Sequence, residues 1–189
     1  MDRRSQILST AGQLFSRQGY HNTSMREIAG ALKLKGGSLY VHIASKEEVL
    51  CEIVGRAADA FLGMAEAVPG ELEPQERLRA LVTGHLRVIA KELEHATVFF
   101  HDWKFLSPQL QASVTARRDL YESHFRRTIE DGAASGAFAV EDAKLATLFV
   151  LSALNWTYQW LDPEGPLPLE ELAEAYCKLV LGALGGEPT

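Results

Sequence analysis

Apolar residues recur along this chain at the spacing of an α-helix, and hardly any stretch alternates as a β-strand does. Within residues 1–46 the pattern predicts three helices. The first ends at Gly19, the second begins at a capping box over Ser24–Glu27, and the third covers about residues 36–41. A second capping box, Ser45–Glu48, predicts the start of a long fourth helix.

The rest of the chain also has helical periodicity, interrupted by segments rich in proline and glycine. The apolar stripes predict helices over about residues 78–93, 98–106, 109–134, 142–160 and 169–184. The helix at 142–160 is apolar nearly all round, which indicates burial on two sides. We therefore predict an all-α protein with an N-terminal three-helix domain over residues 1–46 and a larger C-terminal helical bundle over residues 47–189.

Charge divides the chain in the same way. The protein has 189 residues and a net charge of −6. Residues 1–48 hold seven Lys or Arg against four Asp or Glu, a net charge of +3, which leaves −9 for the remainder. A basic head on an acidic body favours an N-terminal domain that binds a polyanion and a second domain with another task.

Cysteine usage and the absence of a targeting pattern indicate the compartment. Cys51 and Cys177 are the two cysteines, and they lie far apart on stretches predicted to be helical, which favours a reduced intracellular protein. A disulfide between them is the minor alternative. No secretion signal is recognisable, and the most apolar run, residues 143–160, is interrupted by polar side chains. We expect a soluble, cytoplasmic protein without a membrane partner.

The two short helices between residues 24 and 41 have the size and spacing of a helix-turn-helix, whose second helix enters the major groove of DNA. Small residues at the start of that helix allow a close approach to base edges. Ser38 can donate to a phosphate or a base, and Val41 can contact a thymine methyl group. The residues predicted to contact DNA are Ser24, Arg26, Lys35, Gly36, Gly37, Ser38, Tyr40, Val41, His42 and Lys46.

The segment TSMREIAGALKLKGGSLYVHIASKEEVL, residues 23–50, resembles the DNA-binding domain of the TetR family of transcriptional regulators. The resemblance implies an Ω-shaped homodimer whose N-terminal domains bind a palindromic operator in double-stranded DNA. It also implies that a small effector in the C-terminal domain lowers the DNA affinity. The chain departs from the family pattern at Lys33, where a glycine is usual, so we expect a non-glycine residue at positive φ. The chain also departs from the family pattern at Lys35, Gly36, Val41 and Ile43, so the resemblance does not specify which bases this protein reads.

Aromatic and basic side chains of the C-terminal part are candidates for binding the effector. Aromatic residues are dense between residues 99 and 105, and the helix over residues 109–134 adds arginines able to hold an anionic group. The ending SALNWTYQWLDPEGPLPLEELAEAYCKLVLGAL, residues 152–184, resembles the TetR-family branch that responds to acyl-CoA thioesters in fatty-acid, sterol or aromatic-acid breakdown. The predicted ligand-binding residues are Phe99, Phe100, Trp103, Arg118, Tyr121, Phe125, Arg127, Phe149 and Trp156.

The last helix predicts a dimer interface, because its apolar stripe would be partly exposed in a monomer. The predicted interface residues are Leu172, Tyr176, Leu179 and Val180. Together these features predict a ligand-responsive transcriptional repressor that a small effector, an acyl-CoA, releases from its operator.

Two alternatives stay open from the sequence. The same DNA-binding fold can sense bulky hydrophobic or cationic drugs to control efflux, and a helical enzyme or metal-binding protein is the remote alternative. We expect no catalytic residues, metal or cofactor, because no histidine pair has i, i+4 spacing and no glycine-rich loop matches a phosphate cradle.

Overall fold

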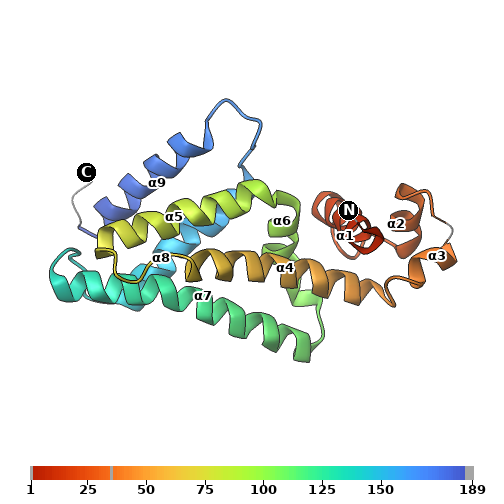
Figure 1. Cartoon of the computed structure of the whole chain (residues 1–189), viewed down its shortest axis with the longest axis horizontal. Helices are drawn as coiled ribbons and strands as arrows, with labels where there is room; N and C mark the ends of the chain where they lie inside the picture. Colours follow the sequence, from red (N-terminus) through yellow and green to blue (C-terminus); the bar gives the residue numbers. More distant parts are fainter. Residues whose placement is uncertain (1, 35, 186–189) are drawn as a thin grey trace. The chain divides into compact units, whose positions relative to one another are not determined.

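The structure of the protein is a computed structural model that describes residues 2–34 and 36–185. Across these ranges the chain forms α-helices joined by turns and two short 3-10 helices, without a β-strand (Figure 1). The all-α fold predicted from the apolar periodicity is confirmed.

The helices form two compact units. Unit 1 contains Met1–Asp59 and Glu92–Ala116, and unit 2 contains Ala60–Lys91 and Arg117–Thr189. Two long helices, α4 (Lys46–Glu66) and α7 (Pro108–Ser135), contribute residues to both units.

Unit 1 begins with the three predicted N-terminal helices, α1 (Arg3–Gln18), α2 (Met25–Ala31) and α3 (Gly36–Tyr40). Gly19 ends α1 at φ 87°, in the left-handed region that glycine tolerates. At the start of α2, the Ser24 hydroxyl and the Glu27 carboxylate each accept the other residue's backbone N–H, so the predicted capping box is confirmed.

Apolar side chains hold these helices together. The fully buried residues of this core include Ile7, Leu8, Phe15, Ile28, Leu39 and Ile43. Leu39 and Ile43 therefore attach α3 to its neighbours, whereas Leu34 is half-buried. In the turn before α3, Lys33 has φ 55°, which confirms the non-glycine residue expected at positive φ.

A further helix, α6 (Leu93–His101), joins this core by packing along α1. The contact is close at Gly12, where an added Cβ would lie 2.6 Å from Cδ2 of His95. We predicted that residue 93 belongs to the preceding helix, which was wrong. The helix breaks at Glu92, with φ −124° and ψ 37°, and the apolar stripe continues across the break, so periodicity does not reveal it.

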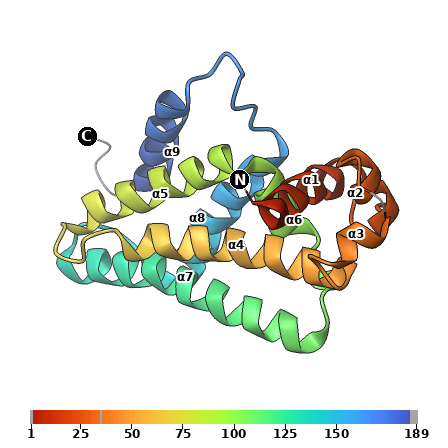
Figure 2. The same cartoon turned by 45° about the vertical axis from the view of Figure 1, so that its right-hand side comes forward.

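In unit 2, α5 (Pro74–Lys91) and α9 (Leu169–Ala183) lie side by side in both views (Figures 1 and 2). Their shared core includes Leu78, Leu81, Val82, Leu172, Cys177 and Val180. Gly136, at φ 78°, follows the last residue of α7, close to the end at residue 134 that the periodicity predicts. Gly132 lies inside α7, and the ring of Phe138 packs where a side chain would be.

The strongly apolar segment over residues 142–160 forms α8 (Ala143–Asn155) and the 3-10 helix η2 (Trp156–Gln159). Val150 and Leu154 are buried, while Leu145, Leu148, Phe149 and Trp156 are exposed. Burial on the second side, which we predicted, is therefore not supplied within one chain.

Cys51 and Cys177 are not joined by a disulfide. No helix in the described ranges is both long enough and apolar enough to cross a membrane.

Candidate DNA-binding surface and ligand-binding residues

The outer side of α3 and of the turn after it presents most of the residues predicted to contact DNA. Gly37, Ser38 and His42 are exposed, and Tyr40 and Val41 are 55% and 81% exposed. Such exposure of a tyrosine and a valine beside the buried Leu39 and Ile43 is what a recognition helix requires. Lys35 lies outside the described residues, as does the burial of Gly36.

Ser24 and Arg26 lie at the start of α2. The Ser24 hydroxyl accepts the Glu27 N–H at 3.2 Å and also bonds the Glu27 carboxylate, which lowers the pKa of Glu27, so a phosphate would compete with Glu27 for this hydroxyl. Arg26 is exposed and can supply a phosphate contact.

Lys46, at the start of α4, makes contacts within the protein that the sequence did not predict. Its Nζ lies 4.2 Å from the ring centroid of Tyr20 and donates to the carbonyl of His21 at 3.5 Å. Burial lowers the pKa of Lys46, against the opposing charges of Glu27 and Asp102. Lys46 thus joins α4 to the turn after α1, besides any contact that it makes with DNA.

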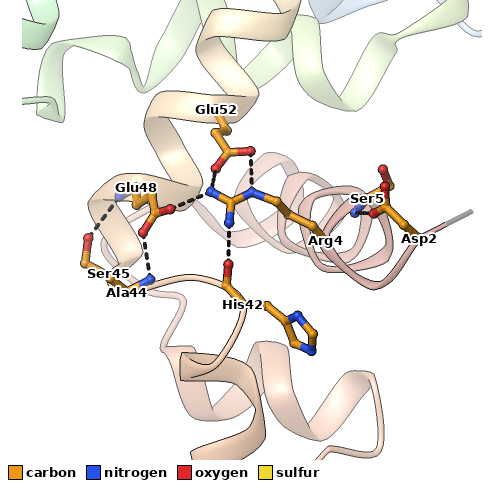
Figure 3. A network of polar contacts seen from close by, with 8 residues as sticks. All are labelled: Asp2, Arg4, Ser5, His42, Ala44, Ser45, Glu48 and Glu52. Atoms are coloured by element: carbon orange, nitrogen blue, oxygen red, sulfur yellow. Dashed lines mark hydrogen bonds and ion pairs between the residues drawn. The ribbon is translucent and has the colours of Figure 1, made fainter.

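An arginine that the sequence analysis did not single out holds the C-terminal end of the recognition helix. Arg4 of α1 donates to the backbone carbonyl of His42 and forms ion pairs with Glu48 and Glu52 of α4 (Figure 3). These carboxylates raise the pKa of Arg4, first through Glu52. We call this network the Arg4 clamp; it attaches the end of α3 to both α1 and α4.

Glu48 also orders the turn before α4. Its backbone N–H donates to the Ser45 hydroxyl at 3.0 Å, and its carboxylate accepts the N–H of Ala44 at 2.7 Å (Figure 3). The second capping box therefore differs from the predicted one, because the carboxylate binds the amide one residue before Ser45. The hydrogen bond to Ala44 and the charge of Arg4 lower the pKa of Glu48.

The turn after α1 also contacts the 3-10 helix η1 (Trp103–Phe105). The Phe105 ring stacks on Tyr20 with centroids 5.9 Å apart and meets His21 edge-on at 4.1 Å. Nearby, the backbone N–H of Ser107 donates to the Glu47 carboxylate at 2.7 Å. Residues after α6 thus pack on the turn after α1 and on the start of α4 within unit 1.

The predicted ligand-binding residues divide between the units. Phe99, Phe100 and Trp103 belong to unit 1. Phe99 is buried, its ring lies 5.1 Å from that of Phe100, and Phe100 and Trp103 are half-buried.

In unit 2, Tyr121 and Phe125 of α7 belong to an aromatic cluster with Phe61 of α4 and His85 of α5. The Tyr121 ring centroid lies 5.7 Å from that of Phe61 and 5.4 Å from that of Phe125. The Tyr121 hydroxyl and Nδ1 of His85 are 2.7 Å apart. Burial lowers the pKa of His85 to about 3, so the imidazole is neutral at pH 7.

His85 and Phe61 belong to this cluster, although neither is among the residues predicted to bind the ligand. The position of His85 in the apolar stripe of α5 was the available signal, because a histidine inside a buried stripe needs a polar partner. The cluster therefore places one hydrogen-bonded polar pair inside an apolar environment.

The two predicted arginines have different surroundings. Arg118 is half-buried, and this burial lowers its pKa against the opposing charges of Asp119 and Glu122. Arg127 is exposed. Phe149 and Trp156, also predicted to bind the ligand, are 56% and 63% exposed.

The predicted dimer residues do not share one environment. Leu179 is 70% exposed, and the half-buried Tyr176 stacks on Trp160 with centroids 6.4 Å apart. Leu172 and Val180 are buried within unit 2. Only the outer part of the predicted stripe is available to a partner.

The described residues are all-helical, and the N-terminal three helices expose the outer side of α3 while Leu39 and Ile43 are buried. This arrangement is typical of a DNA-binding regulator. Residues 7–53 match the family described as bacterial regulatory proteins, tetR family. Residues 71–184 match the tetracyclin repressor-like C-terminal domain. The chain therefore belongs to the TetR family of transcriptional regulators, as its N-terminal sequence indicated.

Relatives of known name agree with this assignment. The HTH-type transcriptional repressor KstR2 of Mycobacterium tuberculosis H37Rv is 27% identical over 98% of this chain and 94% of its own. The crystal structure of PfmR from Thermus thermophilus has a TM-score of 0.87 and 36% identity, covering 98% of both chains. AibR in complex with isovaleryl coenzyme A and operator DNA has a TM-score of 0.85 and 27% identity, covering 94% of this chain and 97% of its own. These names point to DNA binding rather than to catalysis.

Proposed function

We propose that this protein is a dimeric repressor that binds a palindromic operator and leaves it when an acyl-CoA binds. In this proposal residues 1–46 are the DNA-binding domain, and residues 47–189 bind the ligand and the second copy. The observation that carries the DNA-binding part is the outer side of α3, where Tyr40 and Val41 are exposed beside a buried anchor.

DNA recognition follows from this geometry. Gly37, which has open space around its Cα, lets the backbone of α3 approach base edges, and Val41 offers a methyl contact to thymine. Ser24, Arg26 and His42 supply contacts to the phosphates on either side. Two copies related by a two-fold axis would read half-sites about 34 Å apart on one face of the duplex.

The effector is proposed from the aromatic cluster of unit 2 and from the regulator AibR, which was solved with isovaleryl coenzyme A. The cluster offers apolar rings to an acyl chain, and the His85–Tyr121 pair offers hydrogen bonds to a thioester carbonyl. Arg118, half-buried on the same helix as Tyr121, is the proposed contact for an anionic group of coenzyme A. Ligand binding would act on α4, which contributes residues to both units.

A second copy is proposed from the apolar residues that a single chain leaves exposed in unit 2. They include Leu145, Leu148, Phe149, Trp156, Trp160, Leu167 and Leu179. Large exposed apolar side chains so close in sequence are typical of a protein interface. Phe149 and Trp156 fit this contact better than an enclosed ligand site.

A mobility-shift assay tests the proposal on DNA from the protein's own promoter, with a panel of acyl-CoAs, free coenzyme A and a cationic dye. We expect binding in the absence of ligand and release by one class of thioester. Release by the dye alone would replace the acyl-CoA proposal with the drug-sensing alternative. Absence of DNA binding under all conditions would contradict the repressor itself.

Matched variants sharpen this assay. Arg26→Gln removes a predicted phosphate contact, and Arg56→Gln removes the same charge from an exposed position on α4. We expect only Arg26→Gln to reduce the slope of log affinity against log salt, by about 1. Equal slopes in both variants would remove Arg26 from the DNA surface.

A further inference from the structure

A small cavity in unit 2 has the chemistry of an anion site and contains none of the aromatic residues predicted to bind the effector. Its volume is about 160 Å³, and its wall includes Arg77, His124 and Arg127. Ala65, Val68 and Leu81 form an apolar side. The cavity thus combines two guanidinium groups with an apolar wall.

Arg77 is held in place before any ligand arrives. Its Nη1 donates to the carbonyl of Gly70 at 2.9 Å, and its Nη2 forms an ion pair with Asp131. Nε of Arg77 is buried and has no hydrogen-bond partner in the described part of the chain. An acceptor near this guanidinium would therefore meet donors whose orientation is already set.

Arg127 supplies the charge that is not neutralised. Asp131 compensates Arg77, whereas no ion pair of Arg127 is found among the described residues. Burial lowers the pKa of His124, with Glu66 opposing this shift and Arg127 adding to it. The imidazole is therefore neutral at pH 7 and adds a hydrogen-bonding group rather than a charge.

We propose that this cavity binds a short-chain carboxylate, with its carboxylate group at the two arginines and its alkyl chain on the apolar wall. A cavity of about 150 Å³ holds a ligand the size of benzene, so about six non-hydrogen atoms fit. Butyrate has this size and both chemical features. The cavity shares Arg127 with the residues predicted from the sequence to bind the effector, but Arg127 has no part in the acyl-CoA site proposed above, so the two proposals can be tested separately.

Isothermal titration calorimetry of the full chain with sodium butyrate, in a buffer free of carboxylate and phosphate, tests the site. Arg127→Gln should weaken butyrate binding by about tenfold or more, the loss of one charge-assisted contact. Arg126→Gln is the matched control, since Arg126 lies next in sequence, pairs with Glu130 at 3.7 Å and does not line the cavity. It should leave the affinity unchanged.

Val68→Phe provides a second variant, which fills the apolar side without changing the charge and should abolish binding. Inorganic phosphate, titrated in the same way, should bind more weakly than butyrate because it gains nothing from the apolar wall. The proposal is overturned if butyrate gives no binding heat of either sign at two temperatures, if Arg127→Gln and Arg126→Gln behave alike, or if phosphate binds as tightly as butyrate. DNA release by acyl-CoA in the Arg127→Gln variant, measured alongside, shows whether the two sites are separate.

Discussion

Replacing Arg4 with glutamine should weaken operator binding although Arg4 need not touch DNA. In the Arg4 clamp the guanidinium donates to the backbone carbonyl of His42, two residues after α3, and forms ion pairs with Glu48 and Glu52 of α4 (Figure 3). Glutamine cannot form these ion pairs, and it leaves Glu48 and Glu52 as neighbouring like charges one helical turn apart. The end of α3 then moves more freely in the protein without DNA.

The size of the effect follows from how exposed the clamp is. The side chains of Arg4, Glu48 and Glu52 are 42%, 34% and 26% exposed, so solvent screens each pair. Exposed ion pairs contribute about 0.2–1 kcal/mol each, and with the hydrogen bond to His42 we expect about 1–2 kcal/mol in total. DNA binding must restore the lost order, so the affinity should fall by about 5–30-fold at most.

Fluorescence anisotropy with labelled operator at several salt concentrations measures this effect. Arg3→Gln is the matched control, because Arg3 is exposed and carries the same charge, and within the described part of the chain its side chain bonds only to Gln6 on its own helix, at 2.8 Å. Arg4→Gln should lose more affinity than Arg3→Gln with the same salt slope. Equal affinities would refute the clamp, and a slope reduced by about 1 for Arg4→Gln alone would show a direct phosphate contact instead.

Three further changes have defined outcomes. Because the pKa of His85 is about 3 in the folded protein and 6.5 in the unfolded one, only the unfolded chain takes up a proton as the pH falls below 6.5. The free energy of unfolding should therefore drop by about 2 kcal/mol between pH 8 and pH 5, and urea titrations of His85→Phe should lack this component. Lys33→Gly should raise the free energy of unfolding by about 1 kcal/mol, since glycine tolerates φ 55° without strain, and an unchanged urea midpoint would contradict this. Leu179→Arg, at a side chain 70% exposed in one chain, should yield a folded monomer by light scattering and circular dichroism, and a persisting dimer would place the interface elsewhere.

Features that depend on neighbours in the sequence were predictable from it. The ends of α1 and α2 follow from Gly19 and from the Ser24–Glu27 capping box, whose partners lie three residues apart. The positive φ of Lys33 was predictable from the resemblance to the TetR family, in which a glycine is usual at this position. The exposed side of α3 follows from the i, i+4 spacing of the buried Leu39 and Ile43, which turns the residues between them outward.

Features that depend on residues far apart in the chain were not predictable. Glu48 and Glu52 require a cation, but their partner Arg4 lies 44 and 48 residues away, and the first 48 residues offer seven cationic side chains. The meeting of His85 with Tyr121, 36 residues apart, likewise has no local signal.

The outward position of Phe149 and Trp156 has the same origin. Helical periodicity indicates that an apolar face is covered, but it does not indicate whether the same chain, a second copy or a ligand covers that face. Local backbone preferences and capping are short-range, so the sequence determined the helices and the recognition surface of this regulator. The Arg4 clamp, the buried His85–Tyr121 pair and the cationic cavity arise from packing between distant segments, which only the tertiary structure decided.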